Sequence, residues 1–461
     1  MVVSTLERAR RARWRRLAVS ALMVVVALVL IAGCGGNDDE EPAQEAQQTE
    51  APSGQAIKIG VLTTCGGPFA FFEQASFTGA KYALVEHAGG TPAGTEPRDG
   101  VSGATVAGRP IELAFGCSDA TPDVATDEAR RLVENEGVDI LLGPLSGDEG
   151  IAVAEYAKTQ PDTTFVNGTS GAQETTLGVR AENFFRFGGD GAQWMAGLGD
   201  HAYNELGMRD VAILGEDYSY PYTQAAGFIA EFCSLGGTIS ERVWAPLETT
   251  DWSTYVSRLP GDADGILLLT GGANTVAALR AYMGTGGEIG GRVLGGSSVL
   301  DPTAFEIGDQ LAGVVGGSPV PLGGDSEAWR SYVDGFEGAY PDAPAESLFS
   351  VLYYDAMTVI IDALEQVDGN LGGGQAQFRK ALADLQPQFP NGTVQLDQNR
   401  NSVQPAYVVE VAGDGELGFK VDRTVDEVAQ NFGGLFGPGS SPGRDSPECK
   451  SGEPPPWVGQ G

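Results

Sequence analysis

The stretch IKIGVLTTCGGPFAFFEQASFTGAKYALVEHAGG, residues 57–90, decides the fold class. Its first part, residues 57–63, is a short apolar run that stops near glycines, as a buried strand does. Residues 74–90 then have the pattern of a helix that stops at two glycines, because glycine is common just after a helix. A strand, a glycine-rich turn and a helix in this order predict one β–α unit of a parallel sheet.

The same order repeats along the rest of the chain. Further strands are predicted at 109–117, 138–144, 163–168 and 184–187, with helices at 123–137 and 150–158. The pattern then restarts, with strands at 210–216, 238–244, 264–270, 291–296 and 312–320, and helices at 192–207, 221–235, 252–259, 273–283 and 301–311. Helices at 325–339, 346–367 and 375–385 and a strand at 405–411 follow. Strands that alternate with helices predict an α/β chain whose parallel sheets are covered on both faces.

The N-terminus has the pattern of an export signal. Six arginines lie within residues 7–16, and residues 17–30 are almost wholly apolar. This run is short for a membrane span, so we expect a signal peptide at 1–33, with a single-pass anchor as the alternative. The residues that end this run, Ile31-Ala32-Gly33-Cys34, resemble the bacterial lipobox, which implies cleavage before Cys34 and a lipid on its thiol. Residues 34–55 lack hydrophobic periodicity and predict a disordered acidic tether.

The charge of the chain excludes two classes of partner. The 461 residues include 28 basic and 62 acidic ones, a net charge of −34. Removing residues 1–33, with six arginines and one glutamate, leaves 22 basic and 61 acidic residues and a net charge of −39. Nucleic-acid binding depends on Lys and Arg that neutralise phosphates, so we expect no nucleic-acid partner. The same charge opposes attraction to anionic lipid, so a lipid on Cys34 would be the only link to the membrane.

Four cysteines remain if Cys34 is lipidated. An even number outside the cytoplasm favours disulfides, and four cysteines allow three pairings. Cys65 follows the first predicted strand and Cys117 ends the second, and adjacent parallel strands bring such ends close together. We therefore predict Cys65–Cys117, with Cys233–Cys449 attaching the Gly- and Pro-rich tail at 426–461. The alternative is that some of these cysteines are free buried thiols.

The order of these segments resembles the solute-binding proteins of ABC transporters, of the branched-chain amino-acid and amide (leucine-binding) type. The resemblance covers about residues 56–420 and is carried by IGVLTTCGGPFAFFEQASFTGAKYAL (59–84), GCSDATPDVATDEARRLV (116–133), ILLGPLSGDEGIAVAEYA (140–157), FVNGTSGAQETT (165–176), NFFRFGGDGAQWMAGLGDHAY (183–203) and VAILGEDYSYPYTQAAGF (211–228). It implies a type I periplasmic binding protein, with two Rossmann-like lobes joined by a three-segment hinge that closes on a ligand. By this resemblance lobe 1 takes 56–187 and 318–387, and lobe 2 takes 188–317 and 388–425.

Two loops of lobe 1 are the strongest candidates for a ligand site. Residues 143–148 and 167–171 follow predicted strands, and ligands of open α/β sheets bind at the carboxyl ends of strands. Their glycines allow the backbone N–H groups to come close to an anionic ligand, and a helix N-terminus adds positive potential. In the family these loops hold the carboxylate of the ligand, which points to Ser146, Gly147, Gly168, Thr169 and Ser170. The alternative is that these are ordinary turn residues.

Aromatic residues complete the expected site. Phe71 and Phe72, with Phe69, stand where the family places an aromatic wall, although lobe core is an equal alternative. Tyr218 and Tyr220 follow a strand of lobe 2, where the family often uses an aromatic residue, and a hinge-lining or surface role is their alternative. Weaker candidates at later strand ends are Thr270, Asn274, Ser297 and Ser298.

One position departs from the family pattern. Amino-acid binders of this type neutralise the ligand ammonium with an acidic residue of lobe 2, and Ser297 stands in its place. Asp301 lies downstream as an expected helix cap, and Glu216 and Asp217 are other candidates. A zwitterion without a counter-charge binds poorly in a closed cleft. Within the general expectation of an amino acid, an amide or a related carboxylate, this departure points to an amide, a carboxylic acid or another polar metabolite.

The sequence offers no catalytic or metal-binding constellation. It contains no phosphate-binding P-loop, no HExxH and no cysteine pair at zinc spacing, and its two histidines, His87 and His201, lie on separate predicted helices. We expect no enzyme activity, no cofactor and no metal. The expected protein is an extracytoplasmic, lipid-anchored monomer that captures a small polar ligand for an ABC permease and its ATPases. The alternative is an envelope lipoprotein of the same fold that acts as a ligand sensor or as a regulator of a membrane partner.

Overall fold

The computed structural model describes residues 54–413 and 416–459. The predicted signal peptide, Cys34 and all but the last two residues of the predicted tether lie outside these ranges. Within them, no helix combines the length and the apolar character that a membrane crossing requires.

The first lobe is built on a six-stranded sheet in the order β4-β5-β1-β6-β7-β8. Its strands are β1 (Ile57–Thr64), β4 (Thr105–Val106), β5 (Arg109–Ser118), β6 (Ile140–Leu142), β7 (Thr164–Val166) and β8 (Phe184–Phe185). All neighbours are parallel except β4 and β5. The connecting helices are α2 (Glu73–His87), α3 (Pro122–Arg130) and α4 (Gly147–Ala157). The predicted β–α unit at 57–90 therefore forms the centre of this sheet and the helix beside it.

The second lobe is built on an eight-stranded sheet in the order β10-β9-β11-β12-β13-β17-β16, with β18 on β17. Its strands are β9 (Asp210–Glu216), β10 (Thr238–Ala245), β11 (Gly265–Leu269), β12 (Val293–Gly295), β13 (Val315–Ser318), β16 (Gln395–Leu396), β17 (Ser402–Gly413) and β18 (Leu417–Val428). The first five are parallel neighbours and the last three pair antiparallel. Its helices include α5 (Gly191–Trp194), α6 (Leu198–Asn204), α7 (Ser219–Phe232), α8 (Ser253–Val256) and α9 (Ala273–Gly284). The structure confirms the predicted α/β class.

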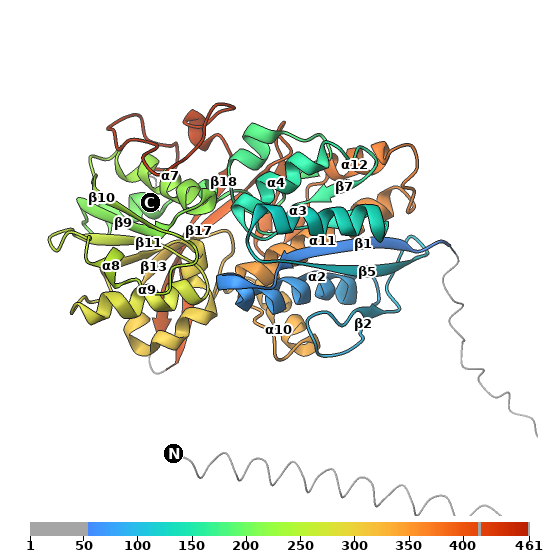
Figure 1. The fold of residues 1–461 in the computed structure, drawn as a ribbon, viewed down its shortest axis with the longest axis horizontal. Coiled ribbons are helices and arrows are strands. Elements are labelled where there is room, and N and C mark those ends of the chain that lie inside the picture. The colour runs from blue at the N-terminus through green and yellow to red at the C-terminus, as the bar shows by residue number, and fades with distance from the viewer. Residues whose placement is uncertain (1–53, 414–415, 460–461) are drawn as a thin grey trace, which may run out of the picture. The chain divides into compact units, whose positions relative to one another are not determined.

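Late segments of the chain return to the first lobe (Figure 1). After β13 the chain forms α10 (Glu327–Ala339), α11 (Leu348–Gln366) and α12 (Ala376–Asp384). The apolar helix α11 packs along α2, so the first lobe is completed by residues almost 300 positions beyond its first strand. The orange strand β17 and its partner β18 then belong to the second sheet.

A buried polar network joins the two lobes where the chain first crosses between them. Arg186 donates to Asn401 Oδ1 (2.6 Å) and to Thr176 Oγ1 (2.6 Å), and its guanidinium lies 3.6 Å from the Asp190 carboxylate. Gln430 donates to both Thr176 Oγ1 (2.7 Å) and Asp190 Oδ2 (2.9 Å). Burial lowers the pKa of Arg186 to about 10 and raises the pKa of Asp190. Removing one member would leave a buried charge without its partner.

Four predicted elements differ from the structure. The helix expected at 192–207 is divided into α5 and α6, because Gly197 takes a left-handed backbone (φ +89°). The segment at 302–311 is a 3₁₀ helix interrupted at Gly308, and the helix expected at 252–259 is only α8. The late strand is longer than predicted and is followed by β18, which the sequence analysis missed.

The C-terminal residues after β18 pack on the second lobe. Phe432, Phe436 and Trp457 form a small apolar cluster with residues of the lobe such as Ala192. Trp457 Nε1 donates to Glu231 Oε1 (2.6 Å), and Cys449 is bonded to Cys233 at the end of α7. The tail therefore packs against the apolar core of the second lobe. The other predicted disulfide, Cys65–Cys117, joins the ends of β1 and β5, and the Cα atoms of each pair are 5.3 Å apart.

Candidate ligand-binding cleft

One cavity lies at the carboxyl ends of strands from both sheets. The first lobe contributes Phe69, Phe72, Leu145, Ser146, Thr169, Leu348 and Phe349, and the second contributes Trp194, Tyr218, Tyr220 and Ser298. The volume that the centre of a water molecule can occupy inside is about 10 Å³, which is room for about one water. The cleft is therefore nearly closed, and a ligand enters only when the lobes separate or the rings turn.

Six aromatic rings form a continuous series around this cavity. Phe349 stacks on Phe72 with ring centres 3.7 Å apart, and Phe69 lies 6.0 Å from Phe72. Phe69 is also 6.0 Å from Tyr218 across the lobes, and Tyr218 is 6.2 Å from Tyr220. Trp194 meets Tyr220 edge-on at 5.6 Å. Most of these separations are typical of favourable aromatic pairs, so the wall is a packed aromatic box.

The polar side of the first lobe is the start of α4. Ser146 is the residue before the helix, and its backbone N–H donates to Glu149 Oε2 (3.0 Å) in a capping box. Thr64 Oγ1 donates to the same carboxylate oxygen (3.1 Å). Thr169 Oγ1 donates to the carbonyl of Leu145 (3.2 Å), which ties the two predicted loops together. The loops thus place two hydroxyl groups at the cavity.

The polar side of the second lobe is made by tyrosine and serine. Tyr220 Oη lies 3.2 Å from Ser298 Oγ. Trp194 directs its N–H away from the cavity, to the carbonyl of Gly188 (2.6 Å). Burial raises the pKa of Tyr218 and of Tyr220 well above the ordinary value, so both phenols keep their protons at neutral pH.

The N-termini of α4 and α7 face each other across the cleft. Ser219, the first residue of α7, donates its backbone N–H to Asp148 Oδ1 of α4 (3.1 Å). A Cβ on Gly147 would lie 2.6 Å from Ser219 Oγ and 2.9 Å from Tyr220 N, so only glycine permits this approach. Two positive helix ends therefore converge beside the cavity.

The structure brings together half of the predicted site residues. Those that line the cavity are Ser146, Thr169, Phe72, Tyr218 and Tyr220. Gly147 and Gly168 lie outside its lining, Gly147 against Ser219 and Gly168 against the ring of Tyr353. Ser170 is buried with its hydroxyl against Gly150, and Ser297 accepts a hydrogen bond from Gln224 (3.0 Å).

Phe71 lies outside the cavity, contrary to the predicted aromatic wall. The residue is 56% exposed and borders a separate surface groove on α9. The segment Gly67–Phe72 is a 3₁₀ helix, in which residues three apart share a face. Phe69 and Phe72 therefore point into the cleft and Phe71 points away from it.

Four lining residues were missed from the sequence: Leu145, Trp194, Leu348 and Phe349. Leu348 and Phe349 are the first residues of helix α11, whose apolar composition predicts a buried core helix. Only the return of this helix to the first lobe places them at the cleft. The indole of Trp194 lies in the short helix α5, which the sequence did not separate from α6.

The acidic residues near the cavity are bonded to protein donors. Glu216 accepts from Asn274 Nδ2 (2.8 Å) and from Gly271 N (3.4 Å), and burial raises its pKa to about 8. Asp217 accepts from Tyr222 and Arg444. Asp301 accepts from Ser347 Oγ (2.6 Å) and caps the next helix through Thr303 N (3.0 Å), as predicted. None of these carboxylates lines the cavity.

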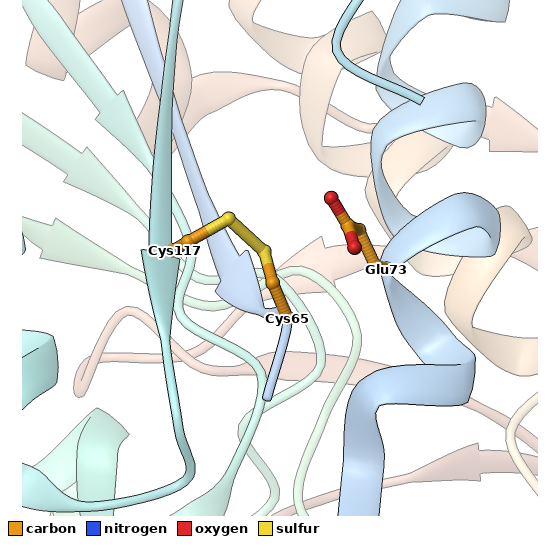
Figure 2. Close-up of side chains that lie close together, drawn as sticks. All are labelled: Cys65, Glu73 and Cys117. Atoms are coloured by element: carbon orange, nitrogen blue, oxygen red, sulfur yellow. A yellow bond between two sulfur atoms is a disulfide. The ribbon is translucent and has the colours of Figure 1, made fainter. Parts of the chain in front are cut away.

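One cluster of potential metal ligands occurs in the described residues, and its chemistry does not fit a metal. Cys65, Glu73 and Cys117 place ligand atoms within 4.8 Å of one another (Figure 2). The two sulfurs are bonded to each other, and Glu73 accepts from Arg98 Nε (2.7 Å). Cysteine binds zinc as a thiolate, and the two sulfurs of a disulfide are not thiolates, so this disulfide is structural.

Comparison with known proteins places the chain among solute receptors. The family described as "Periplasmic binding protein" matches residues 56–416. A curated relative, Leu/Ile/Val-binding protein homolog 6 of Brucella melitensis, is 25% identical over 363 residues, which span 77% of this chain and 87% of the relative.

Solved structures show the same fold. A solute-binding protein of an ABC transporter from Rhodopseudomonas palustris HaA2, in complex with p-hydroxybenzoic acid, has a TM-score of 0.71 at 23% identity and covers 81% of this chain and 98% of that one. A leucine-binding protein from Thermotoga maritima has a TM-score of 0.67 at 20% identity and covers 80% and 99%. The resemblance stated from the sequence is thereby confirmed.

Proposed function

This chain belongs to the periplasmic binding protein family, and from that premise we propose that it captures a small polar ligand outside the cytoplasm and delivers it to an ABC importer. The proposed ligand classes are an amino acid, an amide or a related carboxylate. The protein itself catalyses no reaction in this proposal, and the permease with its ATPases supplies the transport.

The observation that carries this proposal is a nearly closed cavity at the carboxyl ends of the strands, with walls from both lobes. Ser146 and Thr169 come from the six-stranded lobe, and Tyr218, Tyr220 and Ser298 from the eight-stranded lobe. A ligand that touches both walls stabilises the closed arrangement by its contacts with the two lobes together. A permease can then distinguish the loaded receptor from the empty one by its closure.

A thermal-shift screen of the purified protein tests ligand capture. The panel contains amino acids, amides, short carboxylic acids, aromatic acids and sugars. A ligand that binds only the folded form raises the melting temperature. We expect hits among the first four classes and none among sugars. A folded protein that no compound in the panel stabilises would contradict the proposed capture of a polar solute.

An uptake assay tests delivery to an importer. Cells with and without the gene are given the radiolabelled hit at a concentration near its Kd. We expect loss of the gene to abolish high-affinity uptake and a plasmid copy to restore it. Unchanged uptake would contradict the importer role.

We also propose that the mature chain is held at the membrane by a lipid on Cys34 and that it acts as a monomer. The support is the lipobox-like run at 31–34 and the highly acidic chain that follows. Labelling cells with a radioactive fatty acid should mark the wild-type protein and leave Cys34→Ser unlabelled. Label on the Cys34→Ser protein, or a soluble wild-type protein, would refute the anchor.

A further inference from the structure

We propose that the ligand of this cleft is a small carboxylate with an aromatic body and no amino group. This inference rests on the proposed solute-binding function and narrows its ligand class. It is carried by the residues that line the cavity, by the bonds of the acidic residues around it, and by the helix ends that meet there.

The cavity offers no counter-charge to an ammonium group. Its eleven lining residues are six aromatic ones, two leucines, two serines and one threonine. An ionic group enclosed without an opposite charge is strongly disfavoured, because the lobes remove its water. An amino acid would therefore bury its ammonium among rings and hydroxyls.

The acids outside the lining are not positioned to supply that charge. Glu216 bonds to the loop at 271–274, Asp217 to Tyr222 and the tail residue Arg444, and Asp301 to Ser347. Glu149 bonds to Ser146 N and Thr64 Oγ1. Ser297 also lies outside the lining, and its hydroxyl accepts a hydrogen bond from Gln224. Each carboxylate thus stabilises a protein segment behind the wall.

The same surroundings favour a carboxylate. The N-termini of α4 and α7 direct positive potential toward the cleft. Of the backbone N–H groups at the start of α7, Asp148 accepts a hydrogen bond only from that of Ser219. Ser146 brings a buried hydroxyl without a hydrogen-bond partner to the cavity, and Tyr218 brings a second hydroxyl. Burial raises the pKa of both Glu149 and Glu216, which reduces the negative charge that an anionic ligand meets.

The aromatic box favours a flat, apolar body. Phe72 and Phe349 are stacked, and Phe69 with the two tyrosines continues the wall across the lobes. A ring inserted between such rings gains both buried area and offset or edge-on contacts. An aliphatic chain would gain only the burial.

The test uses three compounds that share a phenyl ring and differ in the head group. They are 3-phenylpropanoate, phenylalanine and 2-phenylethylamine, and binding to the purified protein is measured by calorimetry at pH 7. We expect 3-phenylpropanoate to bind at least about tenfold more tightly than phenylalanine, since the uncompensated ammonium is absent. We expect no measurable binding of 2-phenylethylamine.

Each other outcome has a definite meaning. Equal or tighter binding of phenylalanine or of the amine overturns the inference and leaves the solute-binding function standing. The same follows if all three fail while an aliphatic amino acid or amide in the screen binds. If no compound of any class binds, the proposed function itself fails.

A variant provides an independent check on the charge argument. Ser298→Asp introduces a carboxylate at the cavity wall, and Ser298→Ala is the matched control that removes only the hydroxyl. We expect Ser298→Asp to reduce the preference for 3-phenylpropanoate over phenylalanine by about tenfold or more. Ser298→Ala should retain the preference. An unchanged preference in a Ser298→Asp protein with wild-type melting behaviour overturns the inference, and the three-compound comparison stands if that variant does not fold.

Discussion

At the scale of single residues, Thr169 connects the two loops of the first lobe at the cavity. Its hydroxyl lines the cleft and donates to the carbonyl of Leu145. Replacement by alanine removes a hydrogen-bond donor and leaves that carbonyl without its partner. We predict that Thr169→Ala weakens binding of the best ligand about three- to tenfold.

Calorimetry on three variants checks this prediction. Thr169→Ser keeps the hydroxyl and should restore most of the affinity. Thr126→Ala removes a hydroxyl from the outer helix α3, where it bonds to Pro122, and should leave the affinity unchanged. A Thr169→Ala protein with wild-type affinity would exclude the loop from the site.

Glu216 makes stability depend on pH. Burial raises its pKa from an ordinary 4.5 to about 8, so between these values the folded protein holds a proton that the unfolded chain releases. The folded state therefore loses stability as pH rises from about 4.5 to 8. Glutamine keeps an acceptor for Asn274 without this titration. We predict that Glu216→Gln is more stable relative to wild type at pH 8 than at pH 5, by on the order of 3 kcal/mol.

Urea unfolding of both proteins at pH 5 and pH 8 measures this difference. Glu288→Gln, on an exposed part of the second lobe, is the control and should show no such change. A difference between Glu216→Gln and wild type that is the same at both pH values would mean that Glu216 is ionised throughout.

At the scale of elements, the paired N-termini of α4 and α7 hold the closed cleft together. Asp148 lies outside the cavity lining and reaches across the lobes to Ser219 N. Because the bond exists only when the lobes are closed, its loss shifts the equilibrium toward the open form. We predict that Asp148→Ala weakens ligand binding about tenfold without a change in ligand preference.

The matched control for this variant is Asp123→Ala. Asp123 lies in the first turn of α3, so its removal costs a similar helix-dipole interaction without a contact between lobes. Small-angle scattering of each protein with ligand should show a larger radius of gyration only for Asp148→Ala. Equal affinity of Asp148→Ala and wild type would contradict the role in closure.

The elements also show what the sequence could predict. The unit at 57–90 was predictable because a buried strand, a glycine turn and a helix are local patterns, and it became β1, the 3₁₀ turn and α2. The split of α5 from α6 depends on the backbone of Gly197, and periodicity does not reveal it. The cleft was half predictable, because Ser146 and Thr169 follow strands while Phe349 reaches the site only through the packing of α11 on α2.

At the scale of the whole molecule, the tail stabilises the second lobe. The Cys233–Cys449 bond spans 216 residues, and Trp457 bonds to the buried Glu231. We predict that Cys233→Ala with Cys449→Ala lowers the free energy of unfolding by about 2–4 kcal/mol. Without this disulfide, we also expect the tail to separate from α7 and to become accessible to a protease.

Chemical denaturation and limited proteolysis with mass spectrometry measure the two effects. Cys65→Ala with Cys117→Ala is the comparison, since it removes a bond of the first lobe and should leave the tail protected. Cleavage within 432–459 is expected only for the first double variant. A protected tail in that variant would mean that the apolar cluster holds it without the bond.

The polar network around Arg186 connects the junction of the two lobes to the C-terminal tail through Gln430, and this connection suits the protein to optical sensing of its ligand. Gln430 bonds at once to Thr176 of the first lobe and to Asp190, which begins the second. Because Gln430 contacts both lobes where they join, we expect a change in the angle between the lobes to alter these two bonds, and the chain continues from Gln430 to the surface. A dye attached near Ser440 would therefore change its emission as the cleft fills, which makes this receptor a scaffold for a reagentless fluorescent biosensor.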